Sequence, residues 1–443
     1  MKPKGRHRGR PRRPRAAPPR PVEVVDIVKI AQHGDGEGRL ADGMRIFVPL
    51  TLPGDKIRVQ PGQKRGDGLA GTLIEMLAEQ PRKTPICPVF GKCGGCQLQH
   101  LRDDDYRAWK TASLATALSR HGLECDINPL QQVPVNARRR ATLALVMTEA
   151  GPVLGFNEAY SDRIVGMDGC PLLVAEINRL WGPLRDLAAA ILPTPSRADI
   201  AMTAIDGHSI DLNIITGTPL DLHRRETIAA FAETHDIARM SWQGSGEGPE
   251  PVSQRRSVRL QIGKAEISLP SGGFLQPSNE GEGLLQSLVK QGVGDAKHVA
   301  DLYCGIGTFS FVLASAGKHV LAVDENAAQI AALDQAAGRA GLGGHIRTAV
   351  RDLKDSPLEA SALAALDAVI FDPPRAGARI QAECLADSTV PVIIAVSCNP
   401  ATLARDLRVL VDGGYAIQSL TPVDQFPMSH HVEAVAVLRR SGG

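Results

Sequence analysis

The sequence has none of the features of a membrane-spanning or secreted protein. No apolar run approaches the roughly 18 residues that a membrane-spanning helix needs. The first residues, Met-Lys-Pro-Lys-Gly-Arg, contain no apolar core of a signal peptide. We therefore expect a cytoplasmic protein that does not bind membranes, and we expect it to act as a monomer.

The net charge is small, but it hides an uneven distribution. Although the formal charge is +2, residues 1–20 hold nine lysines and arginines and no acid, which leaves 41 basic and 48 acidic residues in the remainder. A basic, proline-rich segment cannot pack a core, so we expect a disordered tail at residues 1–21. Such a tail either contacts the phosphates of a polyanion or only keeps the chain soluble.

Eight cysteines in a long chain without a secretion signal favour metal binding or catalysis over a disulfide framework. Cys87, Cys93 and Cys96 lie close together, among glycines that let the backbone wrap around a metal. Four thiolates bind either zinc or a 4Fe-4S iron–sulfur cluster, and a three-plus-one arrangement favours the cluster. For the fourth ligand we prefer Cys170, which lies in a turn-like context before a proline, over Cys125.

The chain is long enough for about three domains, and its residue patterns divide it accordingly. Short strands between Gly, Asp and Pro turns predict an OB-like β-barrel at residues 22–80. Weaker signals predict a central α+β domain with the metal site at residues 81–265. Alternating strands and helices at residues 266–443 predict an α/β domain with a parallel, doubly wound sheet. The expected strands are residues 24–30, 45–50, 56–59, 69–76, 298–303, 319–323, 368–371, 392–396 and 432–438.

The loop after the first of the α/β strands has the residues of a nucleoside-binding loop. Gly305 and Gly307 let the backbone approach a ligand closely, and Asp324 is placed to bind ribose hydroxyls. A dinucleotide fingerprint would have a glycine where this chain has Ser310. A ligand without a pyrophosphate fits better, and S-adenosyl-L-methionine is the obvious one, with Asp352 positioned for its adenine side.

Two further motifs follow strands of the same sheet. Asp372-Pro373-Pro374-Arg375 follows one apolar strand, and Ser397-Cys398-Asn399-Pro400 follows the next. Alone, a proline pair is a rigid loop and a cysteine after an apolar run is a packing residue. Open α/β sheets bind their ligands at the carboxyl ends of the strands, however, and the cofactor loop lies on that edge. We therefore interpret both motifs as functional.

Together these motifs resemble those of the RNA 5-methyluridine methyltransferases, and specifically of the iron–sulfur branch that modifies 23S rRNA. The barrel resembles the small RNA-binding domain called TRAM. The resemblance covers roughly residues 22–440, and the basic tail lies outside it. It rests on the cysteine motif and on Phe274–Gln276, Asp301–Thr308, Asp372–Arg375, Ser397–Leu407 and Phe426–Glu433.

The resemblance implies a class I S-adenosylmethionine-dependent methyltransferase with a Rossmann-like domain, acting on RNA. It makes Cys398 the nucleophile and Glu433 the base. Thr308 and Asp352 stand where a bacterial relative has Asn, so they match the family less closely. The cofactor and uracil site would be lined by Gln276, Tyr303, Thr308, Asp324, Asp352 and Asp372, and the cluster would be held by Cys87, Cys93, Cys96 and Cys170.

The chemistry of uracil explains why such an enzyme needs a thiol and a base. Addition of a thiolate to C6 turns C5 into an enolate carbon that can attack a sulfonium methyl group. A base then removes the C5 proton so that the cysteine can leave, and Glu433 is the only acid near the start of the final strand. A free thiol with a pKa of about 8.5 is mostly protonated at neutral pH. The site should therefore lower this pKa or accept the proton, while the target base leaves its stack.

Several alternatives remain open at this point. A tRNA 5-methyluridine methyltransferase shares the catalytic motifs, but that branch usually lacks the cysteine set. A non-catalytic RNA-binding protein and a small-molecule or protein methyltransferase are the other classes. Asn399 either binds the uracil edge or shapes its loop. The arginines 138–140 either face RNA or form a solvated start of a strand.

The remaining cysteines and histidines have simpler interpretations. We expect Cys125, Cys304 and Cys384 to be packing residues. We expect His430 and His431 to help in RNA binding or loop packing rather than to bind metal, because no other His or Cys lies at ligand spacing.

Overall fold

A computed structural model describes residues 20–205 and 209–441. The chain forms two compact units, of which the first ends at Pro81 and the second begins at Arg82. The predicted basic tail lies almost entirely outside the described residues. Within the described ranges, every helix is too short or too polar to cross a membrane.

The first unit contains a closed β-barrel. Its strands pair in the order β1-β2-β3-β5-β4, and β1 pairs with β4 to close the barrel. Alternate residues of each strand point inward, so that Val25, Ile46 and Ile57 share one core. The strands are β1 (Glu23–Ile30), β2 (Gly36–Arg39), β3 (Arg45–Val48), β4 (Lys56–Arg65) and β5 (Gly68–Ala78).

Strand β2 is the part of the barrel that the sequence did not predict. It reads Gly-Glu-Gly-Arg and has no alternation of apolar residues. A Cβ atom at Gly36 or Gly38 would clash with Thr51 or Val25, so the small residues are required by close packing. The same glycines that remove the strand signal therefore allow the strand to fit.

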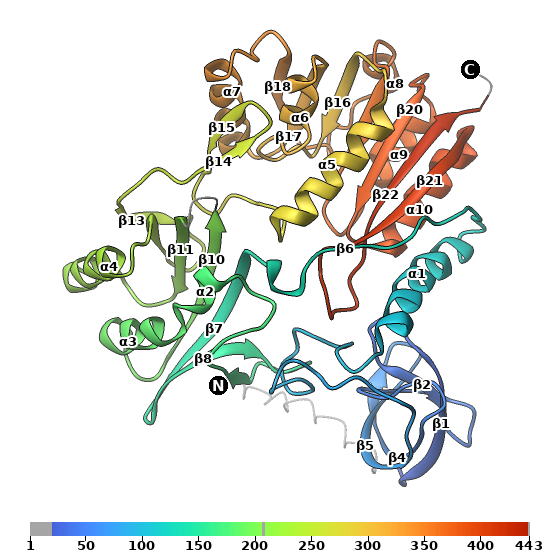
Figure 1. The fold of residues 1–443 in the computed structure, drawn as a ribbon, viewed down its shortest axis with the longest axis vertical. Coiled ribbons are helices and arrows are strands. Elements are labelled where there is room, and N and C mark those ends of the chain that lie inside the picture. The colour runs from blue at the N-terminus through green and yellow to red at the C-terminus, as the bar shows by residue number, and fades with distance from the viewer. Residues whose placement is uncertain (1–19, 206–208, 442–443) are drawn as a thin grey trace, which may run out of the picture. The chain divides into compact units, whose positions relative to one another are not determined.

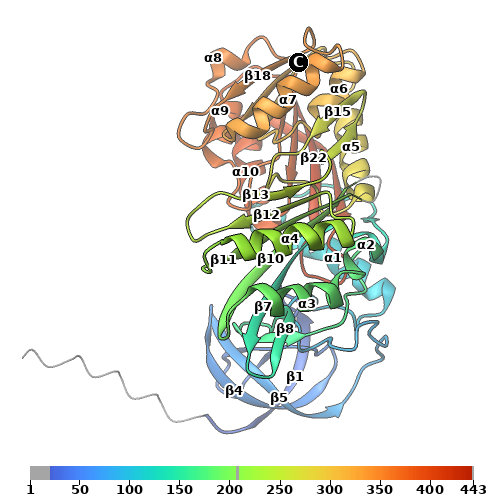
Figure 2. The same ribbon diagram turned by 90° about the vertical axis from the view of Figure 1, so that its left-hand side faces the viewer.

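The second unit contains a mixed sheet covered by helices on one face. The strand order is β13-β12-β11-β10-β7-β8-β9. Leu184 and Phe231, from two helices, pack with Leu143 and Leu212 of the sheet, and Figure 2 shows both helices lying across its strands. The elements are β7 (Arg140–Thr148), β8 (Gly151–Asn157), β9 (Ile164–Gly166), α2 (Ala175–Asn178), α3 (Trp181–Ile191), β10 (Ser196–Ile205), β11 (Ser209–Thr216), α4 (Leu222–Thr234), β12 (Arg239–Gln243) and β13 (Glu250–Gln254).

The C-terminal part is a sheet with helices on both faces (Figure 1). Its strand order is β18-β17-β16-β19-β20-β22-β21-β6, in which β18 to β20 are parallel and β22 is antiparallel to both neighbours. From β16 the chain first adds strands on one side, β17 and β18, and then on the other, β19 and β20. Such a switch point between β16 and β19 opens a crevice at the carboxyl ends of the strands. The strands are β6 (Gln131–Gln132), β16 (His298–Leu302), β17 (His319–Asp324), β18 (Ile346–Val350), β19 (Ala368–Phe371), β20 (Val392–Ser397), β21 (Tyr415–Asp424) and β22 (Glu433–Arg440).

The two faces of this sheet have different helices. One face packs against α5, α6 and α7, and the other against α1, α9 and α10. A small hairpin of β14 (Arg259–Ile262) and β15 (Ala265–Ser268) precedes α5. The helices are α1 (Asp103–Ser119), α5 (Asn279–Val293), α6 (Ser310–Ser315), α7 (Ala327–Arg339), α8 (Ala360–Leu363), α9 (Arg379–Ala386) and α10 (Pro400–Asp412).

A buried ion pair joins the two sheets of the second unit. The Arg139 guanidinium lies 2.7 Å from the Glu282 carboxylate on α5, and both side chains are at most 10% exposed. Arg139 also donates to the carbonyl of Gln276 at 3.0 Å, and its backbone N–H donates to Pro277. For this arginine the interpretation as a solvated start of a strand is therefore wrong.

We expect Glu282→Ala to lower the free energy of unfolding by about 3–5 kcal/mol, because it leaves the Arg139 charge buried without its partner. Urea denaturation followed by circular dichroism measures the change. Glu280→Ala, an exposed position in the first turn of the same helix, is the matched control and should cost less than about 0.5 kcal/mol. Equal effects of the two substitutions would contradict a buried joint.

Candidate active site

A cleft of about 1280 Å³ lies at the carboxyl edge of the α/β sheet and is lined by residues of the second unit only. All the site residues predicted from the sequence line it, except Gly307. Gly307 has a φ of 92°, and a Cβ there would lie 2.8 Å from Leu333. It is thus required for the turn and the packing behind the loop rather than for lining the cleft.

The loop after β16 is braced by the carboxylate of Asp324. One oxygen accepts a hydrogen bond from the Gly305 N–H at 2.9 Å, and the other accepts from the Asn326 N–H at 2.8 Å. Gly305 has a φ of 55°, and Tyr303, two residues earlier, also has a positive φ of 62°. The loop therefore bends tightly beside the cleft, with Asp324 and Asp352 at the ends of the next two strands.

Asp301 and Ser310 form a buried pair behind this loop that the sequence did not reveal. The Ser310 hydroxyl donates to Asp301 at 2.6 Å. Burial raises the pKa of Asp301 to about 7, because a charged carboxylate is disfavoured away from water. Ser310, which stands where a dinucleotide fingerprint would have a glycine, thus hydrogen-bonds a buried carboxyl.

Cys398 lies where β20 ends and α10 begins. Asn399 is the N-cap of α10: its side-chain oxygen accepts from the Ala401 N–H at 3.1 Å, and its amide donates to the Arg375 carbonyl at 3.0 Å. Pro400 then occupies the first turn, where its missing N–H costs nothing. Of the two roles left open for Asn399, these contacts favour shaping the loop.

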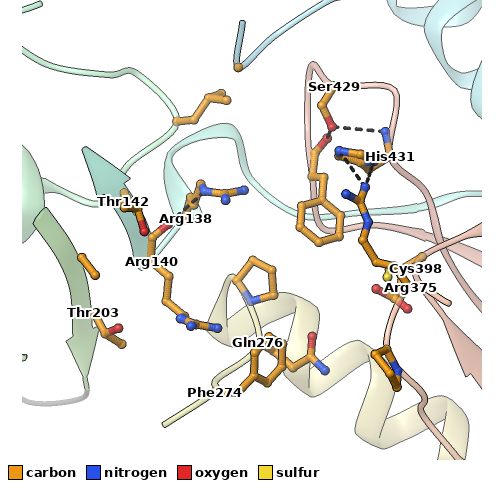
Figure 3. A pocket seen from close by; sticks show the side chains of 18 of the residues that line it. Arg138, Arg140, Thr142, Thr203, Phe274, Gln276, Arg375, Cys398, Ser429 and His431 are labelled. Atoms are coloured by element: carbon orange, nitrogen blue, oxygen red, sulfur yellow. Dashed lines mark hydrogen bonds between the residues drawn. The ribbon is translucent and has the colours of Figure 1, made fainter. Parts of the chain in front are cut away.

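The cleft raises the pKa of the Cys398 thiol to about 11. Burial is the main cause, the carboxyls of Glu433 and Asp372 add to it, and Arg375 opposes it. Figure 3 shows Arg375 and Cys398 side by side on one wall of the cleft. Of the two possibilities considered above, the site does not lower the thiol pKa, so an acceptor must take the thiol proton.

Two buried carboxyls are linked through two glutamines. The Gln425 amide donates to Glu433 at 2.8 Å and to the Gln276 side-chain oxygen at 3.0 Å, while the Gln276 amide donates to Asp372 at 3.4 Å. Burial, with the charge of Asp372, raises the pKa of Glu433 to about 8, and burial raises that of Asp372 to about 7. The second Glu433 oxygen has no hydrogen-bond partner among the described residues.

The sequence did not predict two features of this network. Gln425 was not singled out, although it directly precedes the motif that begins at Phe426. Glu433 is also not the only acid near the start of β22, because Asp424 lies at the end of the neighbouring strand. Asp424 is fully buried and is bound by Lys110 and Tyr106.

Two arginines form the wall of the cleft opposite Cys398 (Figure 3). The Arg140 guanidinium lies 4.7 Å from the ring centroid of Phe274, and that of Arg138 lies 5.9 Å from Phe426. Burial, with the neighbouring arginines, lowers the pKa of Arg140 to about 10. This wall offers cationic and aromatic groups, which suit a nucleobase and its phosphates.

The His431 ring contacts the Arg375 guanidinium. Its ring Nδ1 lies 2.7 Å from an Arg375 nitrogen. Burial, then the charges of His430, Arg375, Lys110 and Arg138, lower the pKa of His431 to about 3. The imidazole is therefore neutral at physiological pH and can accept a hydrogen bond from Arg375.

The four predicted cluster cysteines line one part of the same cleft. All are free thiols. Burial raises the pKa of Cys96 to about 12, and charges on the other three add to this effect. Cys125 instead packs beside the core between α1 and the sheet. Within the described residues, three or more His, Cys, Asp or Glu side chains nowhere have the geometry of a bound metal ion.

Family models match two stretches of the chain. Residues 346–441 match the model described as tRNA (Uracil-5-)-methyltransferase, and residues 287–373 match that of tellurite resistance protein TehB. The first stretch contains both Cys398 and Glu433.

Two curated relatives match nearly the whole chain. An RNA methyltransferase of Brucella suis, described as uncharacterized, is 39% identical over 94% of this chain and 97% of its own. The 23S rRNA (uracil(1939)-C(5))-methyltransferase RlmD of Chromohalobacter salexigens is 32% identical over 95% of this chain and 90% of its own.

A solved structure has the same fold. The Pyrococcus abyssi tRNA (uracil-54, C5)-methyltransferase in complex with S-adenosyl-L-homocysteine superposes with a TM-score of 0.73 at 24% identity, over 94% of this chain and 99% of the other. The agreement of motifs, relatives and fold establishes that the chain belongs to the RNA 5-methyluridine methyltransferase family.

Proposed function

We propose that this protein methylates C5 of a uridine in RNA, using S-adenosyl-L-methionine, and that its substrate is 23S rRNA. The observation that carries this proposal is that Cys398, Glu433 and the glycine loop at Gly305 open into one cleft. The relative named RlmD, which is similar along almost the entire chain, supports 23S rRNA. A tRNA substrate is the second candidate, favoured by the description of the matching family model.

Cys398 acts as the nucleophile of the proposed reaction, and Glu433 acts as its base. The Cys398 sulfur bonds to C6 of the flipped uracil, and the electrons of the C5–C6 bond move to O4. The bound cofactor supplies an electrophilic methyl group, which C5 then attacks. Glu433 removes the C5 proton through its oxygen that lacks a described partner, and the C6–S bond breaks.

The thiol proton needs an acceptor before the first bond can form. Because the thiol pKa is about 11, Cys398 is protonated at neutral pH. The carboxyls that act on this pKa are Glu433 and Asp372, whose own pKa values are about 8 and 7. Because Glu433 must be ionised to remove the C5 proton, Asp372 is the acceptor that the cleft offers for the thiol proton, and Arg375 favours the thiolate once it forms.

Cys87, Cys93, Cys96 and Cys170 hold the proposed 4Fe-4S cluster. The donor set has the right chemistry, because all four are free thiols that line the cleft, and the Gly95 backbone N–H donates to the Cys93 sulfur with an N–S distance of 3.4 Å. A cluster bound there would tie residues 87–96 to the segment at Cys170 and support the fold. The barrel at residues 22–80 is proposed to contact RNA as a TRAM-like domain, the central domain to span residues 81–265, and the catalytic domain residues 266–443.

Loss of the gene should remove 5-methyluridine from 23S rRNA, and the wild-type gene should restore it. Cys398→Ala should not restore it, because the thiol that adds to C6 is missing. Mass-spectrometric mapping of rRNA and tRNA measures both outcomes. Cys384→Ala, a thiol on α9 outside the cleft, is the matched control. Loss confined to tRNA would move the enzyme to that substrate, and unchanged RNA would refute the proposed function.

The turnover rate should rise with pH between about 6 and 9, because a general base works only when ionised. Glu433 has a pKa of about 8 and is protonated, hence inactive, below it. Glu433→Gln should remove this rise and lower turnover by about 100-fold or more. Steady-state release of methylated rRNA across the pH range gives the profile, because the C5 proton is removed only after methyl transfer. The same rise in the Glu433→Gln variant would exclude this residue as the base.

Anaerobically purified protein should be brown and contain iron and sulfide, and Cys170→Ser should lose most of both. Cys125→Ser, which leaves the proposed ligand set intact, should keep the wild-type content. Visible absorption and elemental analysis provide the measurement. A colourless protein with one zinc ion per chain would show that the four thiols bind zinc instead.

A further inference from the structure

Helix α1 carries a lysine where its pattern calls for an apolar residue. Tyr106, Lys110, Leu114 and Leu118 form the buried stripe of the helix, and Lys110 is 0% exposed. Burial lowers its pKa, because the charged ammonium is disfavoured away from water. A buried charge persists only where partners compensate it.

The hydrogen-bond partners of the Lys110 ammonium are Asp424, at the end of β21, and two carbonyls of the chain segment that follows it. The ammonium lies 2.8 Å from the Asp424 carboxylate. It also donates to the carbonyl of Phe426 at 3.4 Å and to the carbonyl of His431. Tyr106 donates to the other Asp424 oxygen at 2.6 Å and accepts from the Met428 N–H at 3.0 Å.

This segment is the connection between β21 and β22, residues 425–432, which we call the catalytic loop. Gln425, at its start, hydrogen-bonds Glu433, which directly follows its end. His431 contacts Arg375 (Figure 3). The loop has no helix or strand of its own, so its shape depends on contacts such as those of Lys110 with Phe426 near one end and His431 near the other.

We propose that Lys110, with Asp424 and Tyr106, is a positioning residue that holds the two arms of the catalytic loop together, so that Glu433 faces C5 of the uracil. Lys110 does not line the cleft and acts through the loop. The proposal rests on the proposed function. It assigns to α1, which lies beside β21 and β6 (Figure 1), a part in the proton-removal step.

The test is the double variant Lys110→Met/Asp424→Asn, in which neither charge is left buried alone. Turnover on 23S rRNA should fall about 10- to 100-fold, as expected when a reacting group is displaced by about 1 Å. The KM values for RNA and cofactor should stay within about twofold of the wild type, because Arg138, Arg140 and Phe274, which form most of the binding wall, lie outside the catalytic loop. The rise of the rate with pH should move to lower pH, because a loosened loop lets water reach Glu433.

RNA containing 5-fluorouridine separates positioning from other defects. Fluorine replaces the proton that Glu433 removes, so attack and methyl transfer proceed but the C6–S bond cannot break and a covalent adduct remains. The double variant should form this adduct at the wild-type yield. Normal adduct with reduced turnover is the expected pair of results, and loss of the adduct would overturn the proposal.

The matched control is Arg239→Met/Asp211→Asn, which neutralises another buried ion pair, on β11 and β12, outside the cleft. Its thermal midpoint should fall as much as that of the test variant, with turnover kept within about twofold. If the test variant does not fold, Tyr106→Phe is the second test, because it removes only the hydroxyl that bonds Asp424 and Met428. Its turnover should fall several-fold, and a wild-type turnover would overturn the proposal. An inactive wild-type enzyme would instead refute the proposed function.

Discussion

The active site depends on the burial of acidic groups close to one another. The Cys398 thiol and the carboxyls of Asp372 and Glu433 share one cleft, and burial is the largest cause of the raised pKa of each. Their pKa values therefore move toward neutrality for the carboxyls and away from it for the thiol. Carboxyls with pKa values near neutrality can both accept and release a proton at physiological pH, which is what general acid–base chemistry requires.

A few strands of one sheet bring these side chains together. Parallel strands end at one edge, so Asp324, Asp372 and Cys398, which are far apart in sequence, reach the same cleft. The antiparallel strand β22 brings Glu433 to that edge from the opposite chain direction. Glu433 therefore reaches the cleft as the first residue of its strand, whereas Cys398 directly follows the end of its own.

The parts of the site that follow apolar strands could be predicted from the sequence, because strands buried on both faces have a clear pattern. Asp372 and Cys398 were placed in this way. Strand β6 could not be predicted, because two glutamines carry no strand pattern and their pairing with β21 is a tertiary contact. Lys110 and Arg139 were missed as buried charges for a related reason: their partners Asp424 and Glu282 lie far away in the sequence.

The buried ion pair of Arg139 also limits which substitutions this enzyme can accept during evolution. Its guanidinium holds the backbone of Gln276, and the side chain of Gln276 connects Gln425 to Asp372. One short segment thus serves both the attachment of the central sheet and the hydrogen bonds that tune the carboxyls. Substitutions that strengthen this attachment will also shift the acid–base balance of the cleft, so stability and reactivity in this protein cannot be selected independently.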